Sequence, residues 1–274
     1  MGPHPQGGMP QQRMPIPGVQ NLIAIGSGKG GVGKTTVSVN LAISLAKLGH
    51  KVGLLDADVY GPNVPLMMGV NRTPSARGER IIPLTGHGVS LMSMGFLNPG
   101  DGALVWRGPR LHGVMQQFLF GVEWGELDYL LIDLPPGTGD VQLSLIQTAA
   151  ITGAIVVTTP SDVSLEDARK AVDMFSQVRV PILGFIENMS FMQCPHCSER
   201  IDPFGHGGGR RTAEAMGLHF MGELPLDPRV RIGGDTGSPV AAAGSPEFEA
   251  LARDLIACAG EERSRKKTTI VVED

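Results

Sequence analysis

The sequence predicts an α/β fold, in which a mostly parallel sheet carries helices on both of its faces. Five short apolar segments have the composition of buried strands, at residues 22–25, 51–56, 129–133, 154–159 and 182–188. Parallel sheets bury both faces of their strands, so these strands are continuously apolar rather than alternating. Segments with helical periodicity alternate with the strands, and this alternation is typical of a parallel sheet covered by crossover helices.

The predicted helices follow from apolar spacing and from signals at their ends. The first covers residues 35–48 and is ended by Gly49. The second begins at Ser164 in the manner of a capping box and continues to about residue 178. A final helix is expected at residues 246–262. Between the second and third strands the pattern is less regular, and the short strand-like runs 80–84 and 89–94 predict a hairpin there.

The chain has 274 residues, of which 42% are hydrophobic, and this suits one α/β domain with a sizeable core. Residues 1–18 are rich in Met, Pro, Gly and Gln, so we expect a disordered tail. Residues 19–262 are predicted to form the single domain, with a cysteine-containing loop at 189–206. Residues 263–274 are expected to form a C-terminal tail.

Composition argues against several classes of partner. The formal net charge is −4 and the pI is about 6.0, whereas proteins that hold nucleic acid by charge usually carry a basic stripe, so no nucleic-acid partner is expected. No stretch approaches the roughly 20 apolar residues of a membrane span, and no signal peptide is recognisable. Three cysteines are too few for a disulfide framework. These observations predict a cytoplasmic protein with reduced thiols and no membrane partner.

The most specific motif is a glycine-rich loop between the first strand and the first helix. Residues 28–35 match G-x-x-x-x-G-K-[ST], a pattern that cradles nucleotide phosphates. Glycines let backbone N–H groups turn toward phosphate oxygens, and the following helix directs its positive end at them. The predicted nucleotide contacts are Gly28, Gly30, Gly31, Val32, Gly33, Lys34, Thr35 and Thr36. We therefore expect ATP binding, with Lys34 as a catalytic cation and Thr35 as a ligand of Mg²⁺.

Carboxylates close two of the predicted strands. Asp56 and Asp58 end the second strand, and Asp133 ends the third. Ligands of parallel sheets bind beyond the carboxyl ends of the strands. Asp58 is predicted to orient the attacking water, Asp133 to bind Mg²⁺, and Asp56 to help hold either Mg²⁺ or the loop. A turn-forming or capping role is the alternative for each carboxylate.

Residues Cys194-Pro195-His196-Cys197 form a C-x-x-C motif. Two thiolates at this spacing can share a metal or a cluster, but a tetrahedral site needs four ligands. A second copy of the chain could supply the other pair at a two-fold axis. Zinc bound within one chain with His196 or His206, a redox dithiol and an unliganded pair are the alternatives. Cys258 lies in an apolar stretch and is expected to be a small buried side chain.

Lys29 gives the loop an additional lysine, as Gly-Lys-Gly-Gly-Val-Gly-Lys-Thr-Thr. This resembles the deviant Walker A ATPases, which include the nitrogenase iron protein, the Min and Par partition ATPases and the arsenite-pump ATPase. The resemblance implies a homodimer that sandwiches two ATP molecules, with Lys29 of each copy reaching the partner's nucleotide. In these ATPases an Asn at the place of Asn188 contacts adenine. The segment containing Pro225 and Asp227 corresponds to the lining of their base pocket.

A larger set of motifs resembles the Mrp/ApbC iron–sulfur cluster carrier ATPases over residues 21–245. The matching segments are residues 28–36, 56–65, Trp106-Arg107-Gly108-Pro109, 133–140, 187–190, the C-x-x-C and 204–208. The resemblance implies a homodimer that binds a [4Fe-4S] cluster between Cys194 and Cys197 of both copies. It also implies transfer of the cluster to apo iron–sulfur proteins, cluster scaffold proteins as partners, and a link to ATP hydrolysis. Arg110 departs from the pattern, which has Met there.

Two other functions fit the same phosphate loop. A partition or positioning ATPase would bind a membrane or DNA. Membrane-binding relatives use a C-terminal amphipathic helix, and residues 266–274 show no helical apolar face. Neither partner requires a C-x-x-C. An ATPase with a structural zinc at the C-x-x-C is the second alternative.

Overall fold

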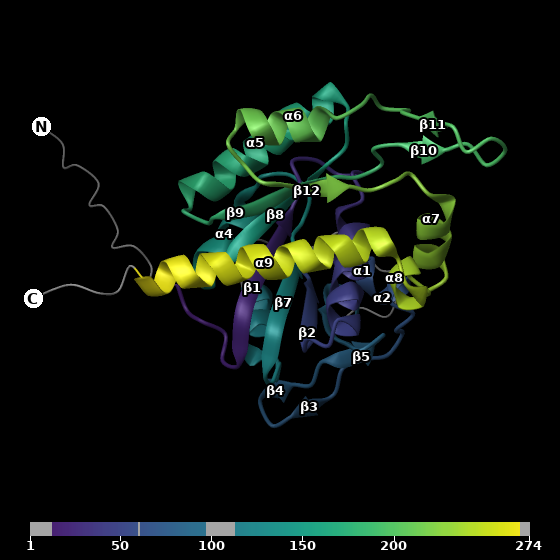
Figure 1. Cartoon of the computed structure of the whole chain (residues 1–274). Coiled ribbons are helices and arrows are strands. Elements are labelled where there is room, and N and C mark those ends of the chain that lie inside the picture. Colours follow the sequence, from purple (N-terminus) through teal and green to yellow (C-terminus); the bar gives the residue numbers. More distant parts are fainter. Residues whose placement is uncertain (1–12, 60, 97–112, 269–274) are drawn as a thin grey trace, which may run out of the picture.

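The computed structural model describes residues 13–59, 61–96 and 113–268 (Figure 1). Tyr60, the Trp106–Pro109 motif and the departure at Arg110 lie outside these residues. So do most of the predicted N-terminal tail and the last six residues of the chain.

An eight-stranded sheet forms the centre of the molecule, in the order β12-β9-β8-β1-β7-β2-β6-β5. Its strands are β1 (Val19–Gly26), β2 (Val52–Asp56), β5 (Leu84–Gly86), β6 (Val89–Ser93), β7 (Leu127–Asp133), β8 (Gly153–Thr158), β9 (Ile182–Glu187) and β12 (Phe220–Glu223). All neighbours pair in parallel except the edge strand β5, which is antiparallel to β6. The mostly parallel α/β fold is therefore confirmed.

Helices cover both faces of this sheet. They are α1 (Lys34–Lys47), α2 (Val64–Met67), α4 (Asp140–Thr148), α5 (Asp162–Gln177), α6 (Gly208–Ala215), α7 (Pro228–Asp235), α8 (Val240–Ala243) and α9 (Pro246–Thr268). One core cluster joins the sheet to α1, α8 and α9, and the other joins it to α4, α5 and α6. Along β1, Ile23 and Ile25 belong to the first cluster while Leu22 and Ala24 belong to the second. The alternating direction of side chains along a strand explains this division.

The five core strands and the helix after the glycine-rich loop lie where the sequence predicted them. Three boundaries are corrected. The helix predicted from Ser164 begins at Asp162, because Ser161 occupies the N-cap and the Ser164 hydroxyl instead bonds the hydroxyl of Thr158, 3.0 Å away. The final helix continues through the predicted tail to Thr268.

The third corrected boundary is that of the predicted N-terminal tail. The prediction of disorder is wrong for residues 13–18, because backbone hydrogen bonds join Met14 to Thr148 and Ala150, and Ile16 is buried in the core. Residues 13–18 therefore belong to the folded domain.

The predicted hairpin is present only in part. The second run, β6, enters the main sheet beside β2 and pairs with β5 as the antiparallel edge. The first run contributes β4 (Arg80–Ile81), which pairs with β3 (Ala76–Arg77) outside the main sheet. Other elements were not predicted. They are the edge strand β12, the helices α2, α4, α6, α7 and α8, and a small hairpin of β10 (Met192–Gln193) and β11 (Arg200–Ile201). Figure 1 shows this hairpin projecting from the body of the molecule above α7.

Candidate functional site

The glycine-rich loop connects β1, which ends at Gly26, to α1, which begins at Lys34. Gly31 and Gly33 both have φ of +80°, a left-handed conformation that side chains disfavour. A Cβ on Gly33 would also lie 2.2 Å from Nδ2 of Asn188. These two requirements explain why the loop carries glycine at this point before the helix begins.

Gly28 meets a different constraint. A Cβ at this position would lie 1.9 Å from the backbone oxygen of Asp167 in α5, so the loop and that helix approach at backbone distance. Gly30, by contrast, is exposed, and the nearest atom to its Cβ position is 3.8 Å away. The glycines of one motif therefore serve different purposes, close packing at Gly28 and backbone conformation at Gly33.

Three side chains of α1 converge on the carboxylate of Asp133. Lys34 Nζ and Ser38 Oγ each lie 2.7 Å from Oδ1, and Thr35 Oγ1 lies 2.7 Å from Oδ2. Asp133 is fully buried and Lys34 is 6% exposed. The structure thus brings together the predicted lysine, threonine and carboxylate. Ser38 was not singled out from the sequence, although its position one turn after Lys34 on the buried face of α1 is the signal for it.

Asp56 is fully buried, and three groups already donate to it. Ser93 Oγ and the backbone N–H of Val64 bond one oxygen at 2.9 and 3.3 Å, and the N–H of Asp58 bonds the other at 3.1 Å. Burial, followed by the nearby negative charge of Asp133, raises the pKa of Asp56 to about 7. These contacts hold the segment after β2 rather than the glycine-rich loop, and they favour such a structural role for Asp56 over binding Mg²⁺.

A cavity of about 430 Å³ lies over the loop. Among the predicted residues it is lined by Lys29, Gly30, Gly31, Val32, Gly33, Lys34, Thr35, Thr36, Asp58, Asn188, Pro225 and Asp227. The other three residues predicted for the nucleotide site, Gly28, Asp56 and Asp133, do not border the cavity. Asn63 and Met189, which lie in the matching segments 56–65 and 187–190, also border the cavity. Leu66, Val230 and Arg231 border it as well, and no local motif marks them because they come from α2 and α7.

Two of the predicted base-pocket residues have definite partners. Asn188 Nδ2 donates to the backbone oxygen of Val32 at 2.8 Å, so this amide braces the phosphate loop. Asp227 caps α7 by accepting from the N–H of Arg229 at 2.8 Å, and its pKa is lowered by hydrogen bonding to the Arg229 side chain. Both residues border the cavity.

Cys194 and Cys197 lie in the turn of the β10–β11 hairpin. The N–H of Cys194 bonds the oxygen of Glu199, and its own oxygen accepts from the N–H of Ser198, both at 2.9 Å. Cys194 is half-buried and Cys197 is exposed. The backbone N–H groups of His196 and Cys197, and then the Cys197 thiol, lower the pKa of Cys194. The turn is therefore folded so that its backbone stabilises a thiolate.

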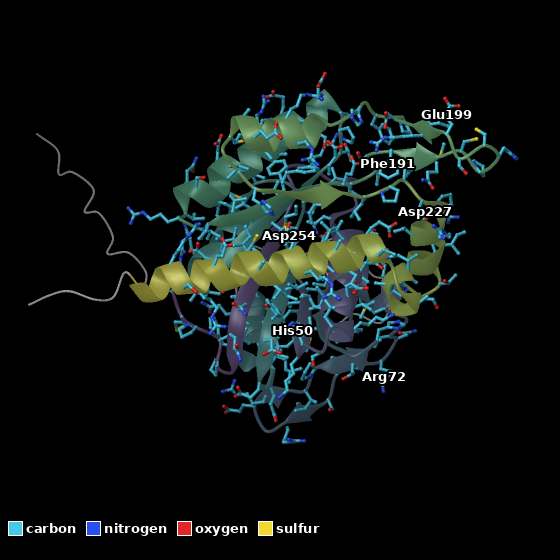
Figure 2. All side chains as sticks on the ribbon, viewed as in Figure 1. His50, Arg72, Phe191, Glu199, Asp227 and Asp254 are labelled. Atoms are coloured by element: carbon cyan, nitrogen blue, oxygen red, sulfur yellow. The ribbon has the colours of Figure 1, made fainter. Side chains whose placement is uncertain are left out.

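The hairpin is fastened to the sheet through Arg200. This guanidinium bonds Glu223 at 3.0 Å and Asp202 at 2.8 Å, and it stacks over the ring of Phe191 at 4.2 Å. Figure 2 shows Phe191 at the base of this arm and Glu199 near its tip, with Asp227 below them. We call residues 191–201 the cysteine arm.

Within the described parts of the chain, Cys194 and Cys197 have no third Cys, His, Asp or Glu ligand converging with them. His206, one candidate for a zinc site within one chain, lies beside Arg200 and Asp202 instead, at 3.1 and 3.7 Å. A second cavity of about 730 Å³ runs from Cys194 to the start of α9. It shares Asn188, Pro225, Leu226, Asp227 and Val230 with the cavity over the loop, so the two candidate sites adjoin.

Cys258 is half-buried on α9, and its thiol lies 3.8 Å from Asp254. The expectation of a small buried side chain is therefore only partly correct.

No helix among the described residues is long and apolar enough to cross a bilayer.

Comparison with known proteins agrees with this geometry. The family model that matches residues 18–257 is ParA, described as NUBPL iron-transfer P-loop NTPase. The iron–sulfur cluster carrier protein of Aquifex aeolicus is 50% identical over 231 residues, which are 83% of this chain and 64% of that protein. The mitochondrial iron–sulfur protein required for NADH dehydrogenase of Arabidopsis thaliana is 48% identical over 246 residues, 87% of this chain and 79% of that protein.

Among solved structures, the nucleotide-binding protein of Archaeoglobus fulgidus in complex with ADP is similar, with a TM-score of 0.75 and 38% identity. The match covers 84% of this chain and 90% of that one. The fold, the phosphate loop and the extent of these matches agree. The chain belongs to the NUBPL iron-transfer group of the ParA family of P-loop NTPases.

Proposed function

We propose that this protein is an ATP-hydrolysing carrier that binds a [4Fe-4S] cluster as cargo and passes it to apo iron–sulfur proteins. The observation that carries the proposal is the cysteine arm, which presents two thiols in a thiolate-stabilising turn beside the nucleotide cavity. The relatives named as cluster carriers support it. Scaffold proteins that assemble clusters are the expected donors.

A homodimer follows from the number of ligands. One chain offers two thiolates at the arm, whereas a [4Fe-4S] cluster takes four. The second pair of thiolates would come from Cys194 and Cys197 of another copy, related by a two-fold axis beside the arm. An isologous interface places the same residues of both copies together. Cys197 is exposed and so available to such an interface.

The nucleotide half of the proposal uses the loop and the groups behind it. Phosphate oxygens would replace Asp133 as the partner of Lys34, and the N–H groups of residues 30–36 would bond them. The hydroxyl of Thr35 and the carboxylate of Asp133 are hard oxygen donors, which fit Mg²⁺. When bound, Mg²⁺ would neutralise phosphate charge. Asp58 is proposed to orient water, and Lys29 to reach the partner's nucleotide.

The base of ATP is proposed to lie in the same cavity, beside Asn188, Pro225 and Asp227. These residues also border the cavity of the cysteine arm. A nucleotide that moved the segment 225–227 would therefore alter the surroundings of Cys194. This adjacency offers a physical route for linking ATP to loading or release of the cluster.

The test of the cluster site is anaerobic reconstitution with iron and sulfide. The wild type is expected to give a brown dimer with visible absorption, and Cys194→Ser and Cys197→Ser are each expected to lose it. Cys258→Ser is the matched control, since this thiol is remote from the arm, and it should retain the absorption. Stoichiometric zinc uptake by a wild type that refuses iron and sulfide would contradict the carrier function.

The test of the nucleotide site compares two lysines of the same helix. Lys34→Ala should abolish ATP binding, because it removes the cation that meets the phosphates. Lys47→Ala should bind normally, since this exposed side chain bonds the oxygen of Ala242 at the other end of α1. Binding is measured by calorimetry and hydrolysis by phosphate release. Intact hydrolysis in Lys34→Ala would overturn the assignment.

A further inference from the structure

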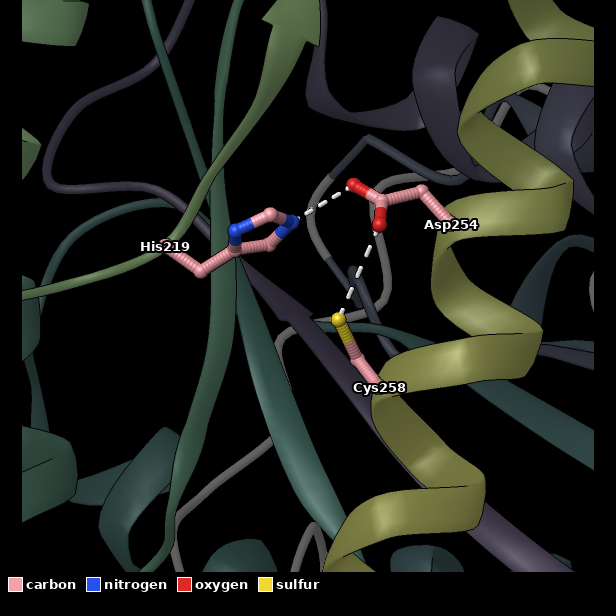
Figure 3. A group of neighbouring side chains, drawn as sticks. All are labelled: His219, Asp254 and Cys258. Carbon is pink, nitrogen blue, oxygen red and sulfur yellow. Dashed lines mark hydrogen bonds and ion pairs between the residues drawn. The ribbon is translucent and has the colours of Figure 1, made fainter.

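Three side chains with metal-binding atoms meet where α9 crosses the edge of the sheet, away from the cavities described above. His219 directly precedes β12, while Asp254 and Cys258 project from α9 (Figure 3). The side-chain donor atoms of the three all lie within 4.8 Å of one another. His219 and Asp254 are 35 residues apart in the sequence, so no local motif marks this cluster.

The distances suit a single small cation. Nε2 of His219 lies 2.7 Å from one oxygen of Asp254, and Sγ of Cys258 lies 3.8 Å from the other. Asp254 and Cys258 are four residues apart, a spacing that places two side chains on the same face of a helix. Metal sites on helices use the same spacing.

The backbones that carry these side chains are fixed. The oxygen of His219 accepts from the N–H of Phe185 at 2.9 Å, which extends the pairing of β12 with β9. On α9, Leu255 and Ala259 flank the site and are fully buried against the sheet. The site itself remains open to solvent, since the His219 side chain is 48% exposed. A cation could therefore enter without a change of fold.

We propose that His219, Asp254 and Cys258 form a binding site for one zinc ion or a similar late first-row divalent cation. An imidazole nitrogen, a carboxylate oxygen and a thiolate are a donor set that such cations prefer. Binding would release the thiol proton to solvent and would displace the hydrogen bonds that Asp254 now accepts. The fourth position would be left for water or another external ligand.

The site would act as a clamp between α9 and the edge strand. Metal bound to the folded chain alone stabilises it by mass action, so the melting temperature should rise with metal concentration. This proposal does not depend on the cluster-carrier function, because none of its three residues touches either cavity. A metal-free ion pair with a neighbouring thiol is the competing description.

The experiment uses the full chain carrying Cys194→Ser and Cys197→Ser, so that Cys258 is its only thiol. This variant is titrated with Co²⁺, whose bond to a thiolate gives a near-ultraviolet charge-transfer band. We expect one equivalent to produce the band, and Zn²⁺ to displace it and raise the melting temperature. Adding Cys258→Ser should abolish the band. Adding Asp254→Asn or His219→Ala should weaken binding by roughly 100-fold or more, beyond the effect of losing a supporting hydrogen bond.

A matched control comes from another His–Asp pair, His50 and Asp128, which lie 3.6 Å apart with no thiol beside them. Adding His50→Ala to the same variant should leave both the band and the metal-dependent melting temperature unchanged. Absence of a thiolate band, or a band that survives Cys258→Ser, would refute the site. A band unaffected by both Asp254→Asn and His219→Ala would show a lone-thiol adduct, which also refutes it.

Discussion

The phosphate loop and the cysteine arm share a border, but they are built in opposite ways. Behind the loop, Lys34, Ser38 and Asp133 are buried within the sheet and helix that form the core. The arm is a short hairpin whose cysteine turn is largely exposed and held by surface contacts of Arg200. The phosphate loop is therefore built on buried contacts that also stabilise the fold, whereas the cysteine turn is held only at the surface.

The largest effect should come from removing the shared acceptor in the core. Asp133→Ala deprives the buried Lys34 ammonium and the hydroxyls of Thr35 and Ser38 of their partner. Breaking a buried charge pair from one side typically costs about 3–5 kcal/mol. Urea unfolding should therefore show a loss of this size. Cys197→Ser, on the exposed turn, should stay within about 0.5 kcal/mol of the wild type, and equal losses in both variants would erase the distinction.

The next largest effect should be a difference in reactivity between the thiols of Cys194 and Cys258. The N–H groups of His196 and Cys197 hold the pKa of Cys194 below its ordinary value, while burial followed by the charge of Asp254 raises the pKa of Cys258 to about 11. As pH rises, Cys194 ionises before Cys258. Because each pKa unit changes the thiolate fraction tenfold, metal-free protein near neutral pH should be alkylated at Cys194 roughly 100-fold faster. Mass spectrometry of iodoacetamide adducts measures this, and similar rates would disprove it.

Two glycines of the phosphate loop should respond differently to an added methyl group. Gly28→Ala places a methyl group against the backbone of α5, and overpacking of this kind costs about 1–3 kcal/mol. It should also weaken ATP binding by displacing the loop. Gly30→Ala, where the nearest atom is 3.8 Å from the Cβ position, should fold and bind as the wild type does. Thermal melting with and without ATP distinguishes the two, and an equal response would mean that the loop adapts.

The smallest effect is expected at the base of the arm. Arg200→Ala removes exposed contacts to Glu223 and Asp202, which are worth about 0.2–1 kcal/mol at a surface. Global stability should barely change, while hydrogen exchange at the N–H of Cys194, which bonds Glu199 across the turn, should accelerate. Exchange that stays slow would show that the hydrogen bonds within the turn hold it without Arg200.

Much of the central sheet could be predicted from sequence because its strands are continuously apolar. The elements at the edges of the molecule could not be predicted in this way. The strand β12 is only partly buried, and the pairs β3–β4 and β10–β11 are two residues long, too short for any periodic pattern. The N-terminal residues 13–18 misled the prediction because their prolines signal disorder, while the burial of Ile16 depends on a distant part of the chain.

The α/β class, the phosphate loop with Lys34 and Thr35, and the paired cysteines could be predicted because each depends on residues adjacent along the chain. Which polar groups meet depends on the tertiary structure. It holds Asp56 on the loop after β2, brings Asn188 to Val32 and sets the arm beside the nucleotide cavity. It also assembles His219 with Asp254 and Cys258. Such contacts depend on how strands are ordered and helices packed, which local pattern does not encode.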